Sequence, residues 1–150
     1  MIFRGTFEHA LDAKNRLTVP AKFRDGLVGR IVLAITPPTE ERSARSLSIW
    51  PADAYDAFAS ASLASLHPLS PRAEVLRNAL YANSWDMELD SANRLMVPQP
   101  AREFVGLEKD VVITGAGNSL QVWDRAGYAD HNAGILARFP EIAASFDHTD

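Results

Sequence analysis

Two stretches of the chain, DAKNRLTVP at 12–20 and DSANRLMVP at 90–98, place an aspartate four residues before an arginine. Six of their nine positions are identical, and the stretches start 78 residues apart. An Asp side chain at the start of a turn accepts backbone N–H bonds from the residues that follow it. An arginine can donate two hydrogen bonds to a guanine edge or to a phosphate. The pattern therefore predicts a rigid turn that presents a cationic side chain.

The first turn carries the denser charge. Lys14 is expected at its exposed tip, and Asn15 where the chain reverses, because asparagine tolerates a positive φ better than most residues. Asp12 is expected to bond Arg16 and keep the turn rigid, which makes Arg16 the candidate for reading a base edge. A plainer interpretation stays open, since an Asp–Arg pair beside a turn usually forms a local ion pair that contributes about 0–1 kcal/mol.

The second turn repeats the structural positions without the central charge. Asp90 and Asn93 are expected to shape this turn, and Arg94 takes the position of Arg16. Ala92 stands where the first turn has Lys14. We therefore expect the second turn to contribute less to binding an anion, or to be mainly structural.

The charge of the chain is unevenly distributed. The net charge of −4 is unfavourable for non-specific binding to nucleic acid. Residues 1–24 nevertheless contain five Lys and Arg against two acidic residues. A local basic surface is therefore expected at the N-terminal end.

The composition argues against several classes of site. The absence of Cys removes disulfides, Cys-ligated zinc and thiol nucleophiles. The four histidines lie far apart in the sequence, so neither a metal site nor any cofactor is expected. No apolar run approaches the roughly 18 residues of a membrane span, and the first residues lack an export pattern. A cytoplasmic location is expected.

The similarity between the two stretches extends to their neighbours. Each copy is predicted to contain a strand, a tight turn, a second strand, a short helix and two further strands. The corresponding positions include Phe7, His9 and Leu11 with Trp85, Met87 and Leu89, and Trp50 and Tyr55 with Trp123 and Tyr128. One copy offers too few strands to bury its apolar face, so about eight strands from both are expected to form a closed or interlocked small barrel.

The predicted fold class is α+β, with four segments. Repeat 1 covers 6–54, a helical linker covers 55–83, repeat 2 covers 84–127, and a C-terminal helix and tail cover 128–150. Within this scheme helices are expected at 51–66, from Ser70–Pro71 to about Asn83, and at about 124–138. The segment after Pro140 is expected to fray.

These residues resemble the MraZ family of bacterial transcriptional regulators. The resemblance is carried by FRGTFEHALDAKNRLTVPAKFR, by the second copy DSANRLMVP, by their spacing and by the total length. It covers the chain from Phe3 to about Tyr128. The family commonly has Gly before the Arg of the motif, where this chain has Asn15 and Asn93, and Asn can take the same backbone conformation.

The resemblance implies a fold and a function. The implied fold is a β-rich barrel of two swapped-hairpin AbrB-like half-domains with peripheral helices, assembled into a ring of identical chains. The implied function is sequence-specific binding to double-stranded DNA at G-rich direct repeats upstream of the division and cell-wall gene cluster, usually as a repressor. The DNA-binding residues that the resemblance implies are Lys14, Asn15, Arg16 and Arg94, with Arg4 of the FRG opening as a weaker candidate for contact with a phosphate. A nucleoid-associated location follows, with neither a membrane nor a small-molecule substrate as partner.

The residues also leave other readings open. Asp12 and Asp90 could share a proton as an acid–base dyad, but the matching arginine beside each aspartate favours two separate turns, so no enzyme is expected. An AbrB-like protein-interaction module of the antitoxin type, without specific DNA readout, is the second alternative. Phe58, Leu63 and Leu66 either join neighbouring chains or belong to the chain's own core. The polar loop 37–46 indicates no role.

Overall fold

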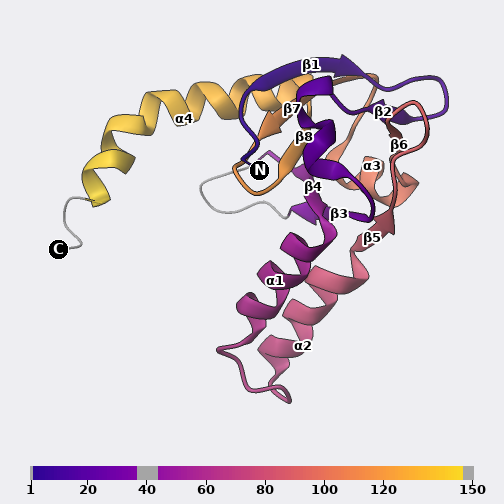
Figure 1. Ribbon diagram of the computed structural model, residues 1–150. Helices are drawn as coiled ribbons and strands as arrows, with labels where there is room; N and C mark the ends of the chain where they lie inside the picture. Colours follow the sequence, from indigo (N-terminus) through magenta and orange to yellow (C-terminus); the bar gives the residue numbers. More distant parts are fainter. Residues whose placement is uncertain (1, 37–43, 147–150) are drawn as a thin grey trace.

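The computed structural model describes residues 2–36 and 44–146 (Figure 1). Most of the polar loop at 37–46 and the last residues of the expected tail therefore lie outside the described residues. The first repeat contains β1 (Thr6–Ala10), β2 (Arg16–Thr18), a 3₁₀ helix (Ala21–Leu27), β3 (Ile31–Thr36) and β4 (Ser46–Pro51), and α1 (Ala52–Leu63) leads out of it. The second contains β5 (Ser84–Met87), β6 (Arg94–Met96), α3 (Gln99–Val105), β7 (Asp110–Gly115) and β8 (Leu120–Asp124), and α4 (Arg125–Phe146) leads out of it. The expected order of elements is confirmed in both copies.

The two repeats exchange strands. β1 of the first repeat pairs with β7 of the second, and β5 of the second pairs with β3 of the first. β4 and β8 join the two halves at the centre, which gives one six-stranded antiparallel sheet in the order β1-β7-β8-β4-β3-β5. β2 and β6 form a separate two-stranded ribbon. The α+β class is confirmed. The described strands form a six-stranded sheet and a separate two-stranded ribbon, rather than one closed barrel of paired strands.

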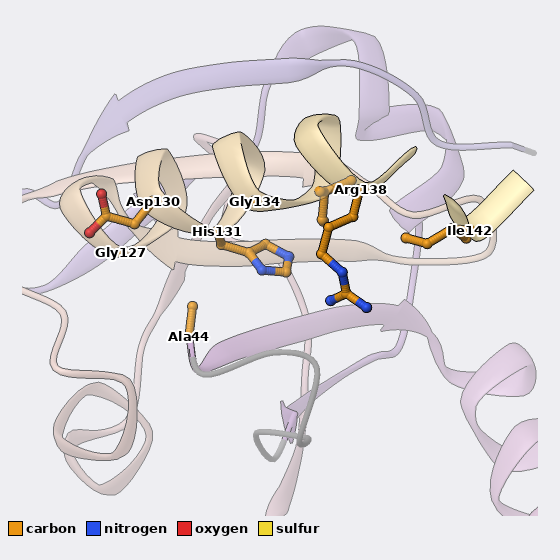
Figure 2. A pocket seen from close by; sticks show the side chains of 8 residues that line it. Ala44, Gly127, Asp130, His131, Gly134, Arg138 and Ile142 are labelled. Atoms are coloured by element: carbon orange, nitrogen blue, oxygen red, sulfur yellow. The ribbon is translucent and has the colours of Figure 1, made fainter. Parts of the chain in front are cut away.

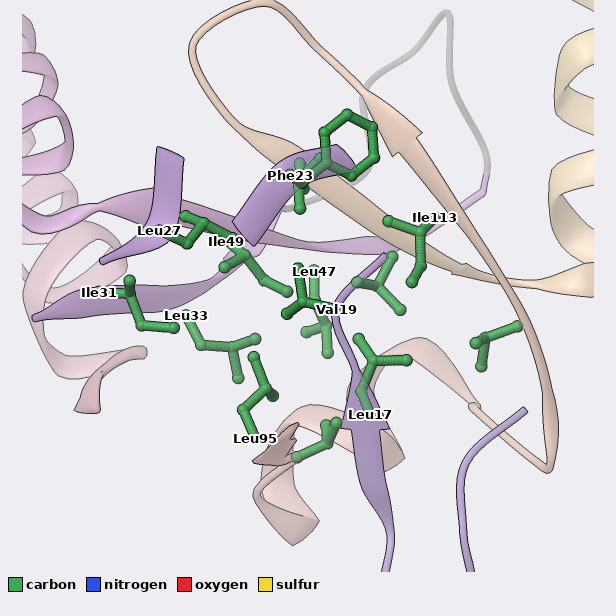
Figure 3. Packing of buried hydrophobic residues seen from close by; sticks show 14 of the residues in the cluster. Leu17, Val19, Phe23, Leu27, Ile31, Leu33, Leu47, Ile49, Leu95 and Ile113 are labelled. Carbon is green, nitrogen blue, oxygen red and sulfur yellow. The ribbon is translucent and has the colours of Figure 1, made fainter. Parts of the chain in front are cut away.

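The ribbon and the sheet share one core (Figure 3). Leu17 and Leu95 lie opposite one another in the ribbon and are almost fully buried, as are Val19 and Val97 just beyond it. They pack with Leu33, Leu47, Ile49 and Ile113 from the sheet. Because side chains alternate along a strand, burial of these residues forces their neighbours on the ribbon to face outward.

A helical hairpin covers the other face of β3 and β4. Ser70 caps α2 (Pro71–Arg77) by accepting a bond from the amide of Ala73 at 3.1 Å, and the helix continues as a π-helical turn (Asn78–Ala82). The Tyr55 hydroxyl of α1 donates to the Leu80 carbonyl and joins the two arms. Phe58 stacks on Trp50 with ring centroids 5.0 Å apart, so one of the expected contact residues belongs partly to the chain's own core.

The C-terminal helix is longer than the sequence predicts. α4 runs through Pro140 to Phe146 and projects away from the sheet (Figure 1). A proline inside a helix removes one hydrogen bond and bends the axis, but the turns on either side can continue. The expectation of an end near 138 was therefore wrong. Within the described residues, every helix is too short or too polar to cross a bilayer.

The N-terminal segment is held against the β7–β8 hairpin by backbone contacts. Phe3 donates to the Gly117 carbonyl at 2.8 Å, and Gly115 donates to the Gly5 carbonyl at 2.8 Å. A Cβ atom on Gly115 would lie 2.4 Å from backbone atoms of Phe3 and Arg4. Only glycine therefore lets residues 3–5 lie flat on this hairpin.

We predict that Gly115→Ala destabilises the chain by about 1–3 kcal/mol, because backbone must move to admit the methyl group. Urea unfolding would measure the change. Gly127→Ala is the matched control, since nothing lies within 4 Å of a Cβ there and alanine favours a helix. Equal unfolding midpoints for the two variants would contradict the prediction.

Candidate nucleic-acid interface

The first turn is built around the Asp12 carboxylate. Its Oδ1 atom accepts bonds from the amides of Lys14 and Arg16, both at 2.9 Å. Its Oδ2 atom accepts a bond from Arg16 Nε at 2.7 Å. Asn15 reverses the chain with φ of 59°, and its amide donates to the Asp12 carbonyl at 2.9 Å. The predicted geometry is confirmed, and the Lys14 side chain is exposed at the tip.

The second turn has the same hydrogen bonds. Asp90 Oδ1 accepts from the amides of Ala92 and Arg94 at 2.9 Å, and Oδ2 accepts from Arg94 Nε at 3.0 Å. Asn93 reverses the chain with φ of 60°. Only the backbone of Ala92 takes part, as does only the backbone of Lys14 in the first turn. The side chain at the tip is therefore free to differ between the copies without loss of the turn.

Both aspartates are held in the ionised state. In each case the pKa is lowered mainly by the backbone amide of the arginine four residues on, and desolvation opposes this effect. The amide of the tip residue and the guanidinium lower the pKa further. A proton-sharing dyad requires one carboxyl with a raised pKa. Two lowered values and two separate ion pairs therefore contradict the acid–base reading of Asp12 and Asp90.

The ribbon brings the two arginines to one surface. The register places Arg16 opposite Met96 and Arg94 opposite Thr18. Since Leu17 and Leu95 point into the core, these four side chains face the opposite way. Arg16 and Arg94 are diagonal neighbours, a relation that places them about 7–8 Å apart in an antiparallel pair. Arg16, Thr18, Arg94 and Met96 are called the ribbon face below.

Each arginine is held by a hydrogen bond from its Nε atom, while the Nη groups at the end of its side chain remain available to a ligand. In the part of the chain that the structure describes, Nε of Arg16 and of Arg94 bonds its aspartate, and the terminal Nη groups donate to no other side chain. The turns are also tied to the opposite strands, because Val19 donates to the Asn93 carbonyl and Val97 to the Asn15 carbonyl, both at 3.0 Å. Neither turn can therefore move without the other.

Arg4 is placed apart from this face. It is exposed in the N-terminal segment, where its carbonyl accepts a bond from Lys22 Nζ at 3.4 Å. The described contacts of this segment are with Lys22, the 3₁₀ helix and the β7–β8 hairpin, rather than with the ribbon. Thr18 and Met96, in contrast, share the ribbon face with the arginines. The alternation of side chains in RLTVP and RLMVP is the sequence signal for this placement, because Thr18 and Met96 each stand two residues after an arginine.

A hollow of about 350 Å³ lies beside α4 (Figure 2). The side chains of His131 and Arg138 point to the same side of the helix, towards Ala44 (Figure 2). His131 stacks on Trp123 with ring centroids 4.8 Å apart, in the place that Phe58 takes against Trp50. The position of His131 is therefore explained by packing on Trp123. The described residues hold no cluster of side chains that could bind a metal ion.

The two carboxylates give a prediction for pH. A lowered pKa means that the turn is fully stabilised above the usual value of 3.8 and loses that support as the pH falls through the lower folded value. We expect the carboxyl carbons of Asp12 and Asp90 to titrate below pH 3.8 by ¹³C NMR, with Arg16 and Arg94 Hε shifting in step. A midpoint above 3.8 for either carboxyl would contradict the geometry.

Comparison with known proteins identifies the family. The family model MraZ, described as "MraZ protein, putative antitoxin-like", matches residues 2–74 and 80–146. A protein named transcriptional regulator MraZ from Nitrosomonas europaea is 36% identical over 129 residues, covering 83% of this chain and 82% of that protein. Its namesake from Anaeromyxobacter dehalogenans is 39% identical over 133 residues, covering 85% and 87%.

A third protein of that name, from Nocardioides sp., is 31% identical over 150 residues and covers 99% of both chains. All three carry the name of a regulator rather than an enzyme, in agreement with the expectation that this chain is not an enzyme. A match along nearly the whole chain, over both copies of the turn, shows that the chain belongs to the MraZ family.

Proposed function

We propose that this chain regulates transcription by binding duplex DNA in a sequence-specific manner through the ribbon face and its two turns. One observation carries the proposal: a two-stranded ribbon presents Arg16 and Arg94 on one face as diagonal neighbours, each already fixed by its own aspartate. The names of the family's curated members support the regulatory role.

The dimensions of the ribbon suit a groove. The major groove of B-DNA is about 12 Å wide and admits a two-stranded β-ribbon. A guanidinium held at Nε still offers its Nη groups, and arginine donors pair with the N7 and O6 acceptors of guanine. Because Asp12 already holds Arg16, less side-chain entropy is lost when DNA binds. Lys14, at the exposed tip, is assigned to a phosphate.

The second turn is assigned a smaller share of the binding energy. Arg94 has the same fixed geometry as Arg16, but the tip beside it is Ala92 and adds no positive charge. Asp12, Asp90 and Asn93 act on the shape of the turns, and Asn15 adds a polar edge near Lys14. Arg4 contributes at most a peripheral phosphate contact, since its segment packs on the β7–β8 hairpin.

We extend the proposal to the biological target that the family resemblance implies. The target is a set of G-rich direct repeats upstream of the division and cell-wall gene cluster, which the protein represses from the cytoplasm in association with the nucleoid. In this scheme 6–54 and 84–127 are the two DNA-facing repeats. The segments 55–83 and 128–150 serve assembly.

A ring of identical chains explains how an acidic protein binds DNA. Each ribbon face alone offers few cations, but several faces on one rigid frame raise the affinity about 10²–10⁴-fold through effective concentration. α4 exposes apolar side chains at helical spacing, including Ile135, Phe139 and Ile142, with Leu136 beside them. These side chains are suited to contact a neighbouring chain.

The α1–α2 hairpin offers a matching surface. A hollow of about 440 Å³ there is lined by Leu66, Pro71, Arg72, Val75, Leu76 and Ala79. The hairpin and α4 leave the sheet in different directions (Figure 1), so α4 of one chain is assigned to the hairpin of the next. Contacts between different surfaces of identical chains close into rings when the rotation allows it.

A protein-interaction module of the antitoxin type is the second candidate, favoured by the same exposed apolar residues of α4 and by the antitoxin-like description of the family. Such a module would use α4 and leave the ribbon face idle. The two candidates therefore differ in whether substitutions on the ribbon alter binding to DNA.

We predict that Arg16→Ala lowers affinity for the chain's own upstream DNA by at least about 10-fold, because one bidentate base contact is worth about 1–3 kcal/mol. Arg94→Ala should have a smaller effect. Gel shifts at two salt concentrations would measure both, and Lys14→Ala should reduce the salt dependence by about one phosphate.

Arg77→Ala is the charge-matched control, since Arg77 lies in α2 and its guanidinium donates to the Pro68 carbonyl of the same hairpin rather than to the ribbon. Because this hairpin is assigned to assembly, light scattering of the variant must first give the wild-type mass. The substitution should then leave DNA affinity unchanged. If the control and Arg16→Ala bind DNA equally well, or if the wild-type chain binds none, the interaction-module reading is preferred.

We predict that replacing Leu136 and Phe139 by Ser reduces the solution mass to that of a single chain, because both are largely exposed, at 65% and 61%, and would lose their neighbour. Light scattering would measure the mass. Ala137→Ser, on the same helix, is the control and should leave assembly intact. An unchanged mass would exclude α4 from the interface.

A further inference from the structure

The ribbon face is almost symmetric. At a few equivalent positions the two copies carry different residues, and these differences make one end of the face unlike the other. Arg16 and Arg94 are equivalent positions of the two copies, as are Thr18 and Met96. The tips of the turns differ as well, with Lys14 in one and Ala92 in the other. Each end of the ribbon therefore has the same arginine in the same geometry, surrounded by different neighbours.

The register determines which neighbours stand together. Because Arg16 lies opposite Met96, one end of the face combines the Lys14 turn, Arg16 and a thioether. Because Arg94 lies opposite Thr18, the other end combines the Ala92 turn, Arg94 and a hydroxyl. The positive tip and the apolar side chain thus fall at the same end, and the neutral tip and the hydroxyl fall at the other.

The two differing side chains recognise different chemistry. Met96 is 59% exposed and has no hydrogen-bond donor, so it favours an apolar surface such as the methyl group of thymine. Thr18 has a hydroxyl that donates and accepts, so it bonds the polar edge of a base. Both lie beside an arginine on the outward side of the ribbon, since Leu17 and Leu95 occupy the inward side.

We propose that Thr18 and Met96 are specificity-determining residues, and that their difference, with that between Lys14 and Ala92, makes the chain bind DNA in one orientation. A symmetric ribbon would bind a site equally well after rotation by half a turn about its twofold axis. This ribbon reads a non-palindromic site, with a thymine methyl at the Met96 end and a polar base edge at the Thr18 end. The inference rests on the proposed binding of DNA, and it names the base-pair features that the ribbon face recognises.

Directed cleavage tests the orientation. The chain contains no cysteine, so a single cysteine can carry an iron chelate that cleaves nearby DNA. Ala13→Cys and Ser91→Cys place it at equivalent exposed positions of the two turns. The probe is a duplex with one copy of the motif that the wild-type chain selects from a random-sequence pool. Each variant should cut one end of the motif, and the two should cut opposite ends, whereas equal cutting at both ends would overturn the inference.

An exchange of the differing residues tests their role. Thr18→Met with Met96→Thr, combined with Lys14→Ala and Ala92→Lys, preserves composition and charge while interchanging the ends of the face. The cleavage pattern should reverse, with affinity retained. An unchanged pattern would overturn the inference. Circular dichroism and thermal unfolding of the exchanged chain establish that it is folded.

A single substitution provides an independent readout. Met96→Thr makes the two ends alike at this position and should lower the preference for the selected base pair about 10-fold, the loss of one base contact. Affinity for random-sequence duplex should stay unchanged. If preference is unchanged while Arg16→Ala still lowers affinity by at least about 10-fold, the inference fails and the proposed function stands. If the wild-type chain binds no duplex, both fail.

Discussion

One carboxylate in each turn organises the surface that this protein offers to a partner. It accepts two backbone amides through one oxygen and a guanidinium through the other, so the same group shapes the turn and aims the arginine. The geometry recurs in the second copy with the same partners. A side chain on a free strand would search many rotamers, whereas this one is fixed before any ligand arrives.

The strand exchange makes this local device rigid. Two turns on separate domains would move independently, but here each turn is hydrogen-bonded to the strand that leaves the other. The ribbon beneath them is anchored by leucines in the common core. The spacing of Arg16 and Arg94 is therefore set by strand pairing rather than by a linker, and duplication of the motif produces one surface instead of two.

The sequence was sufficient for the features that depend on local chemistry. An aspartate, an asparagine and an arginine at fixed spacing predicted the hydrogen bonds and the positive φ of Asn15, because each follows from the backbone within a few residues. The Ser70–Pro71 helix start was predicted for the same reason. The repeat also predicted that the two copies complete one another.

Features that depend on contacts between residues far apart in the sequence were harder to predict from the sequence. The division of the strands into sheet and ribbon follows from pairings between the copies, which local patterns do not specify. Pro140 suggested a helix end, yet the turns on both sides of it are helical. The neighbours of Arg16 became clear only with the register, because Met96 lies 80 residues away in the chain and directly opposite in the ribbon.

The exchange of strands also has a consequence for biosynthesis. β1 finds its partner only when β7 has been made, and Phe7 pairs with Ile113. At the roughly 5–20 residues per second of translation, the first strand waits several seconds without its native neighbour. Two nascent chains on one messenger could meanwhile pair the β1 of one with the β7 of the other, since the contacts are identical. The β3–β4 hairpin pairs within the first copy, and the helical segment at 52–82 follows it, so both are complete before the β7 strand that β1 requires.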